Sequence, residues 1–238
     1  MGPEESGAWR ECRQGIVAIL PVVAACVPIG VVWGALAAER GLSLAEIWLM
    51  SAAVFAGASQ FVAIGMWTTP LPIAAIVLAT AMVNLRHVMM SASLQRRMER
   101  FSAAQRYLAY GWLTDEAWAL AEARAAREPL TPAYYAGLAG PLFVVWPLAS
   151  LTGGAFGKVM GDPAAYGLDF VFTALFIGLI VGFRSAPAWL PVVLASAALA
   201  LITYHLLPPP WYVIVGGLAG VAVATLQAPV ARTAPLEA

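Results

Sequence analysis

Charged residues are scarce in this sequence. Asp, Glu, Lys and Arg make up 11% of its 238 residues, whereas 61% are hydrophobic and the mean hydropathy is +0.80. A soluble protein with this composition would have too few polar side chains to cover its surface. The composition therefore argues against a soluble globular protein and predicts an all-α polytopic membrane protein.

The sequence also lacks features typical of several other protein classes. The formal net charge is zero, so nothing indicates a nucleic-acid partner. Cys12 and Cys26 do not make a disulfide or metal framework, and we expect no cofactor. The apolar runs are continuous where barrel strands would alternate, which disfavours a β-barrel. Residues 1–13 are polar and the next apolar run is long enough to stay as a span, so we expect no cleavable signal.

The apolar runs predict seven to eight transmembrane helices in one membrane-embedded domain, residues 1–238. The connecting loops are short and leave no room for a separate soluble domain. The expected helices cover residues 15–38, 45–67, 71–94, 106–122, 131–156, 168–184, 187–207 and 210–227.

The fourth segment, residues 106–122, decides the number of spans. If it crosses the membrane, the basic residues divide evenly between the two sides, with no positive-inside bias. If it dips in and returns, most arginines, including Arg124, are inside, and those outside are Arg10, Arg13 and Lys158. The sequence therefore favours seven spans with a short or re-entrant fourth segment.

The arrangement of a possible internal repeat also depends on whether the fourth segment spans the membrane. Residues 28–61 resemble residues 147–180: each has a proline, a small-residue patch, a charged loop and a long apolar helix. With a re-entrant fourth segment, the halves would be two inverted three-helix repeats, a plan of many secondary transporters. With a spanning fourth segment they would be parallel, and both alternatives stay open.

The second expected helix carries Gly57, Ser59 and Gln60 within the motif FAGASQF (55–61). A buried glutamine needs partners for two donors and one acceptor group. Gln60 therefore either cross-links helices or meets a polar ligand.

The third expected helix places Asn84, Arg86 and His87 deep in an apolar run. An arginine at that depth costs about 2.5 kcal/mol or more, which indicates a functional site. On an ideal helix Arg86 points about 160° away from Asn84. We favour an interruption of the helix here, which would let all three face one cavity. The alternative is that Arg86 pairs with a neighbouring helix.

The fourth segment carries the adjacent acids Asp115 and Glu116 in WLTDEAWAL (112–120). Thr114 is a suitable N-cap that would put both acids in a first helical turn. Such a start requires a break after Gly111, and transporters place binding sites at breaks of this kind. Either acid is also an expected counter-ion for Arg86.

Taken together, FAGASQF (55–61), NLRHVMMSASL (84–94), WLTDEAWAL (112–120) and GLDFVFTALF (167–176) resemble the AzlC family, the large subunit of branched-chain amino acid exporters. The resemblance implies a multi-pass bacterial inner-membrane permease, not an enzyme, that exports leucine, isoleucine, valine or analogues with proton coupling. It also implies a small hydrophobic partner subunit, AzlD. The sequence departs from the pattern at Trp118, where we expect a smaller aromatic residue, and this bears on the shape of the pocket.

The chemistry of a zwitterionic substrate agrees with this resemblance. Arg86 or freed backbone N–H groups could bind the carboxylate, and Asp115 or Glu116 the ammonium group. His87 or an acid could carry the proton. Aromatic and methionine side chains would line the apolar pocket, among them Phe55, Phe61 and Trp112.

Two rival functions fit parts of the sequence. Ser59 with His205 would suit an intramembrane serine hydrolase, although Gln60 follows the serine where a small residue would shape an oxyanion hole. A non-transporting scaffold or channel predicts that Arg86→Ala and Asp115→Asn leave leucine efflux unchanged.

Overall fold

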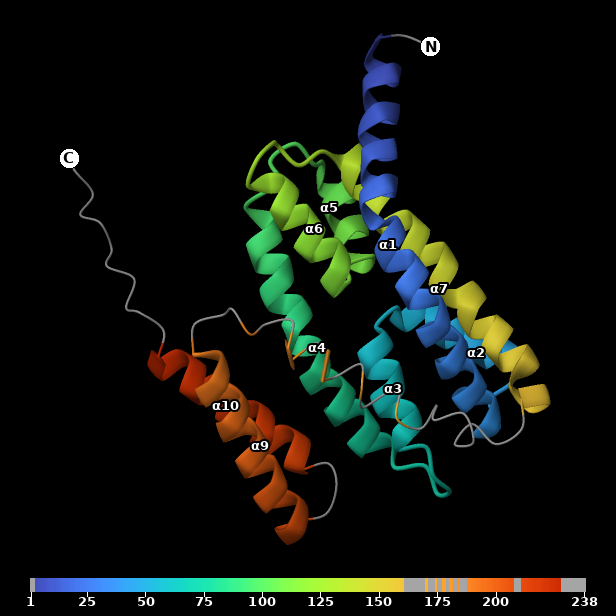
Figure 1. The fold of residues 1–238 in the computed structure, drawn as a ribbon, viewed down its shortest axis with the longest axis vertical. Helices are drawn as coiled ribbons and strands as arrows, with labels where there is room; N and C mark the ends of the chain where they lie inside the picture. Colours follow the sequence, from blue (N-terminus) through green and yellow to red (C-terminus); the bar gives the residue numbers. More distant parts are fainter. Residues whose placement is uncertain are drawn as a thin grey trace. The chain divides into compact units, whose positions relative to one another are not determined.

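The computed structural model describes residues 3–160, 188–207 and 211–227, with scattered positions between 170 and 184. The described residues form helices and no strand, which confirms the all-α class. The helices are α1 (Pro3–Glu39), α2 (Leu44–Val54), α3 (Gly57–Gly65), α4 (Ile73–Gln95), α5 (Ala103–Gly111), α6 (Asp115–Ala125), α7 (Pro132–Met160), α9 (Trp189–Leu206) and α10 (Trp211–Gln227) (Figure 1). Among the described helices, four are long and apolar enough to cross a membrane: Gly7–Glu39, Ile73–Gln95, Pro132–Phe156 and Trp189–Leu206.

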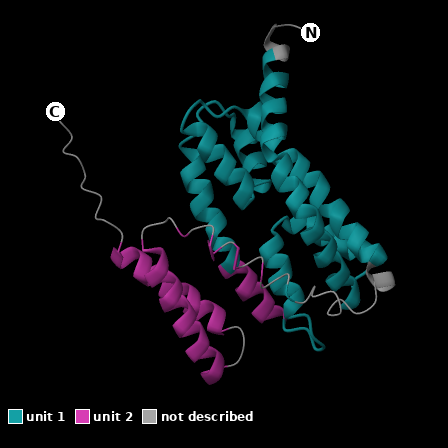
Figure 2. Ribbon diagram, in the orientation of Figure 1, with its two compact units in different colours: residues 1–72, 83–171 teal, residues 73–82, 172–238 magenta. Residues whose placement is uncertain are grey.

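The chain forms two compact units, Met1–Pro72 with Val83–Val171, and Ile73–Met82 with Phe172–Ala238 (Figure 2). The candidate site residues belong to the first unit.

In the second unit, α9 and α10 form an antiparallel hairpin that matches the predicted helices 187–207 and 210–227 within about two residues. Their close approach depends on glycine: a Cβ at Gly216 would lie 2.8 Å from the Ala200 Cβ. The predicted helix 168–184 lies mostly outside the described residues.

In the first unit, α1 and α7 pack side by side and run in the same direction (Figure 1). Gly15, in the first half of α1, meets Tyr134 near the start of α7, and Gly34 meets Ser150 further along both helices. A Cβ at Gly34 would collide with the Ser150 carbonyl oxygen, so a small residue there permits the contact.

The second predicted helix, 45–67, is not one helix, and that prediction is wrong. It is divided into α2 and α3 at Phe55, whose φ of 43° is left-handed. A left-handed residue ends the regular hydrogen bonding of a helix. Beyond α3, the Trp67 carbonyl accepts a hydrogen bond of 3.2 Å from Arg40, which follows α1. Both ends of the α2–α3 segment therefore lie beside the end of α1.

The fourth segment is also broken, into α5 and α6, and the break after Gly111 is confirmed. Phe101, just before α5, packs edge-on against Tyr135 with ring centroids 6.2 Å apart. Arg124, at the end of α6, lies over the Tyr134 ring at 4.7 Å. Both ends of this segment therefore lie at the beginning of α7, as the re-entrant alternative requires.

The α2–α3 and α5–α6 segments each begin and end on the same side of the first unit, and this sets the direction of α7. Between α1 and α7 the described chain has one long helix, α4, of which Val83–Gln95 belongs to the first unit, and α1 and α7 are parallel (Figure 1). Of the two alternatives for residues 28–61 and 147–180, the described parts, which lie on α1 and α7, have the parallel one. They are parallel although the fourth segment does not cross, because the second segment does not cross either. Most of residues 161–180 lie outside the described residues. A long helix followed by two short ones occurs twice instead, as α1–α3 and α4–α6, with α1 and α4 running in opposite directions.

One end of the first unit is rich in arginine. Arg124 forms an ion pair of 3.1 Å with Glu11, and Arg97 one of 3.3 Å with Glu122. These pairs bring the start of α1, the end of α4 and the end of α6 together. The predicted separation of the N-terminal arginines from Arg124 is wrong, because the returning second segment leaves them on one side. This arginine-rich end comprises Arg10, Arg13, Arg96, Arg97, Arg100, Arg106, Arg124 and Arg127.

Candidate functional site

The two helix breaks meet on one aromatic ring, Phe143 of α7. Phe55 contacts it edge-on, with centroids 5.1 Å apart, and Trp112 stacks on it at 4.9 Å. Because α3 and α6 begin just after these two residues, their N-termini start in the same region. The N-terminus of a helix carries a positive partial charge and free N–H groups. The arrangement thus places two potential ligand-binding helix ends close together.

Gln60 and Gly57 hold the first break against α7. Gln60 is fully buried; its Nε2 donates to Ser51 Oγ at 3.3 Å, and its Oε1 accepts from Trp146 Nε1 at 2.8 Å. A Cβ at Gly57 would lie 3.0 Å from the Trp146 ring, so the indole packs directly over the glycine. Gln60 therefore cross-links α3 to α2 and α7, which is the first of the two interpretations that the sequence left open.

The helix that carries the third cluster, α4, is continuous, so the predicted interruption is wrong. The segment contains no glycine or proline, and its polar side chains find partners on different helices. Asn84 Oδ1 accepts from Ser59 Oγ of α3 at 2.6 Å, while Arg86 lies 3.0 Å from Asp115 of α6. Their divergence on an ideal helix thus requires no unwinding. The structure has the alternative arrangement, with Asp115 as the counter-ion.

The start of α6 follows the sequence prediction. Thr114 is the N-cap, and its Oγ1 accepts from the Ala117 N–H at 3.2 Å. Asp115 and Glu116 occupy the first turn, where the helix dipole stabilises carboxylates. Within the described residues Glu116 makes no hydrogen bond or ion pair, and it interacts electrostatically with Cys26 of α1. Glu116 is thus an acid at the break that is free to meet a cation.

Two further polar groups adjoin the ion pair. His87 is half-buried beside Arg86 and Asp115, next to the backbone of Leu113 in the second break. The Nε of Arg86 is buried and has no hydrogen-bond partner within the described residues. Buried polar groups are nearly always paired, so this nitrogen is available to a ligand.

Ser59 does not have the surroundings of a nucleophile. It is 1% exposed, and its hydroxyl donates to Asn84 rather than to an imidazole. A serine nucleophile needs its proton held by a base.

Nothing in the sequence singled out the aromatic residues of α7, although they organise the site. Phe143 receives both breaks and Trp146 holds Gln60. Their spacing of three residues on one face of α7 was the available signal. Trp118, the departure from the expected pattern, contacts neither residue: its Nε1 donates to Ser93 Oγ at 2.8 Å, near the arginine-rich end.

The fold and the paired breaks define a class: a polytopic α-helical membrane protein with discontinuous helices. The comparisons give the family. A family model described as AzlC protein matches residues 21–160, so the chain belongs to the AzlC family, and the resemblance is confirmed.

The relatives are similarly distant. The chain is 28% identical to the inner membrane protein YgaZ of Escherichia coli (strain K12), over 95% of this chain and 94% of that protein. It is 30% identical to an uncharacterized membrane protein of Helicobacter pylori, over 73% and 78%. It is 28% identical to the branched-chain amino acid transport protein AzlC of Bacillus subtilis, over 75% and 70%. No solved structure matches the chain.

Proposed function

We propose that this chain is the large permease subunit of a secondary transporter that exports branched-chain amino acids across the bacterial inner membrane, with proton coupling. It would act without enzymatic activity or a cofactor. The observation that carries the proposal is that two helix breaks meet on Phe143. Beside it lie the uncapped N-terminus of α3 and the start of α6, whose first turn carries two acids. The printed name of the Bacillus subtilis relative supports the substrate class.

The carboxylate of the substrate binds the N-terminus of α3 in this proposal. The N-cap, Ala56, offers no side-chain hydrogen bond, so the N–H groups of the first turn remain for an anion. Arg86 contributes positive charge through its free Nε. Gln60 and Gly57 position the break, and Ser59 ties it to Asn84.

The ammonium group binds at the start of α6. Glu116 is the first candidate because Asp115 is already paired with Arg86 at 3.0 Å. The rings of Phe55, Trp112 and Phe143 supply an apolar surface for a branched side chain. An apolar binding surface of this kind favours leucine, isoleucine and valine over polar amino acids.

His87 carries the coupled proton in this scheme. It lies beside the Arg86–Asp115 pair, so a change of its charge alters the balance of the substrate site. The arginine-rich end faces the cytoplasm, as the positive-inside rule requires. A small hydrophobic membrane subunit completes the transporter, a proposal that rests on membership of the AzlC family.

Efflux of labelled leucine from cells that make this chain, with and without a small hydrophobic subunit, tests the function. We expect efflux that stops when a protonophore collapses the gradient. Glu116→Gln should reduce it at least about tenfold at unchanged protein level, whereas Glu99→Gln, which changes an exposed acid away from the breaks, should not. Absence of gradient-dependent efflux in both cell types would refute the proposal.

A further inference from the structure

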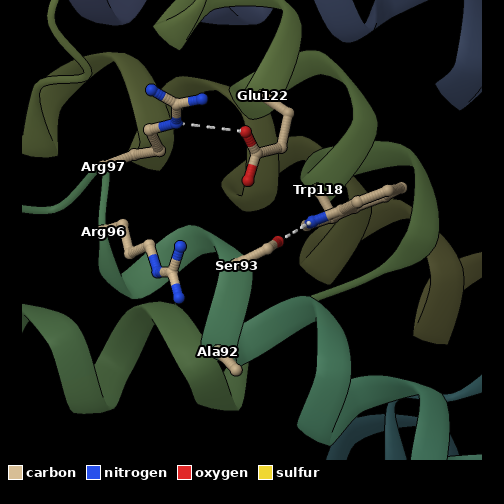
Figure 3. A pocket seen from close by; sticks show the side chains of 6 residues that line it. All are labelled: Ala92, Ser93, Arg96, Arg97, Trp118 and Glu122. Atoms are coloured by element: carbon tan, nitrogen blue, oxygen red, sulfur yellow. Dashed lines mark hydrogen bonds and ion pairs between the residues drawn. The ribbon is translucent and has the colours of Figure 1, made fainter. Parts of the chain in front are cut away.

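A cavity lies at the arginine-rich end, away from the two breaks. It has a volume of about 750 Å³ and is lined by Ala92, Ser93, Arg96, Arg97, Trp118 and Glu122, from the end of α4 and from α6 (Figure 3). We call it the Arg96 cavity. The proposed transport site uses none of these residues.

The charge of the Arg96 cavity is positive. Arg97 Nε lies 3.3 Å from Glu122 Oε2, so these two charges largely offset each other (Figure 3). Arg96 makes no hydrogen bond or ion pair within the described residues. The lining therefore carries one uncompensated positive charge on a side chain with five N–H donors. A singly charged anion matches it, and phosphate oxygens suit a guanidinium group.

The opposite wall is an indole held in place. Trp118 Nε1 donates to Ser93 Oγ at 2.8 Å (Figure 3). Ser93 Oγ in turn donates to the Met90 carbonyl at 3.0 Å. These bonds orient the ring without using either arginine. Tryptophan is enriched where membrane proteins meet lipid headgroups, because its body is apolar and its N–H is polar.

An exposed apolar stripe leads from the cavity along α4. Leu85, Met89 and Ala92 follow one another at four and three residues, and Arg96 comes four residues later on the same face. Leu85 is 52% exposed and Met89 67%, and Ala92 is also exposed and lines the cavity. A ligand here would meet a cation and an indole at one end and an apolar helix face below.

We propose that the Arg96 cavity binds the headgroup phosphate of an anionic phospholipid, with an acyl chain along the α4 stripe. A monoanionic phosphodiester matches the single free charge, and the stripe distinguishes a lipid from a soluble phosphate. The site depends on Trp118, which the wider family pattern does not lead us to expect. It does not depend on the proposed transport function.

Thermal unfolding of the full chain in a zwitterionic detergent tests the proposal. Short-chain phosphatidylglycerol should raise the unfolding midpoint, whereas equal concentrations of short-chain phosphatidylcholine or of inorganic phosphate should not. Arg96→Gln should weaken the phosphatidylglycerol effect at least about fivefold in concentration. Arg96→Lys should keep most of it, and Arg100→Gln, which removes the same charge from the same basic segment outside this cavity, should keep all of it.

Three results would overturn the proposal. Equal shifts from phosphatidylglycerol and phosphatidylcholine would exclude recognition of the charge. An equal shift from inorganic phosphate would assign the cavity to a soluble anion. Equal losses in Arg96→Gln and Arg100→Gln would reduce the effect to general attraction by the basic segment. If Arg96→Gln does not fold, native mass spectrometry of the wild type with mixed lipids decides, since retention of phosphatidylcholine and phosphatidylglycerol in equal amounts would refute the site.

Discussion

The two broken segments of the first unit share one backbone plan and differ in chemistry. Each starts with a capping box, in which Ser43 pairs with Glu46 and Ser102 with Gln105. Each then breaks at an aromatic residue that packs on Phe143. At the break, however, α3 starts without a side-chain cap, whereas α6 starts with a threonine cap and two acids.

This difference shows how two broken helices could bind the two oppositely charged groups of a zwitterion. An uncapped helix N-terminus attracts an anion through its N–H groups and its dipole. A helix N-terminus whose first turn carries two carboxylates has its positive end offset and attracts a cation instead. Because the α2–α3 and α5–α6 segments enter the first unit from opposite ends, the N-termini of α3 and α6 can meet. Variants that alter one break at a time test this difference.

The largest effect is expected from Asp115→Asn at the α6 break. It leaves Arg86, whose side chain is 26% exposed, without its counter-ion, which costs about 3 kcal/mol of stability. Thermal unfolding in detergent and leucine efflux should both show a loss. Adding Arg86→Gln should restore stability but not efflux, because the charge is balanced again while the site is changed. Full stability in the single variant would show that the ion pair is not structural.

A smaller loss is expected from Gln60→Leu at the α3 break. Leucine is close in volume but leaves Trp146 Nε1 and Ser51 Oγ without partners, at a cost of about 2 kcal/mol. Thermal unfolding measures it. Gln95→Leu, which changes an exposed glutamine at the end of α4, is the matched control and should be near neutral. If both variants unfold alike, Gln60 does not hold the break.

Removal of the α6 cap should cost less again. Thr114→Ala loses the hydrogen bond to the Ala117 N–H, worth about 1 kcal/mol, and Thr114→Ser should keep it. The same thermal unfolding measurement separates them. Equal midpoints for the alanine and serine variants would mean that the acids alone stabilise the start of α6.

The sequence predicted the α6 break because its signals are local. Thr114 followed by two acids is an N-terminal pattern that can be read without knowledge of the neighbours. The counter-ion of Arg86 followed from charge alone. These are the features whose energetics depend on adjacent residues or on a single partner.

The α3 break and the continuity of α4 could not be predicted in the same way. Phe55 is left-handed although it is not glycine, and the contacts that accompany it, with Phe143 and through Gln60 to Trp146, come from α7, about 90 residues further along the chain. Likewise α4 stays intact because Asn84 and Arg86 find partners on different helices. Long-range packing therefore determines both the α3 break and the continuity of α4, and a hydropathy pattern does not report long-range contacts.

The smallest stability effect, and the most direct test of the comparison, is expected from Ala56→Ser. It gives α3 the kind of side-chain cap that α6 already has, at an N-cap position whose backbone is non-helical, with φ −138° and ψ 88°. A hydroxyl that accepts from the first turn should stabilise the protein by about 0.5 kcal/mol or more. It should also raise the KM for leucine several-fold, because the capped N–H is no longer free for a carboxylate. Ala53→Ser, on the exposed side of α2, is the matched control and should change neither quantity. An unchanged KM with a raised unfolding midpoint would separate the cap from the substrate and remove the carboxylate from the α3 N-terminus.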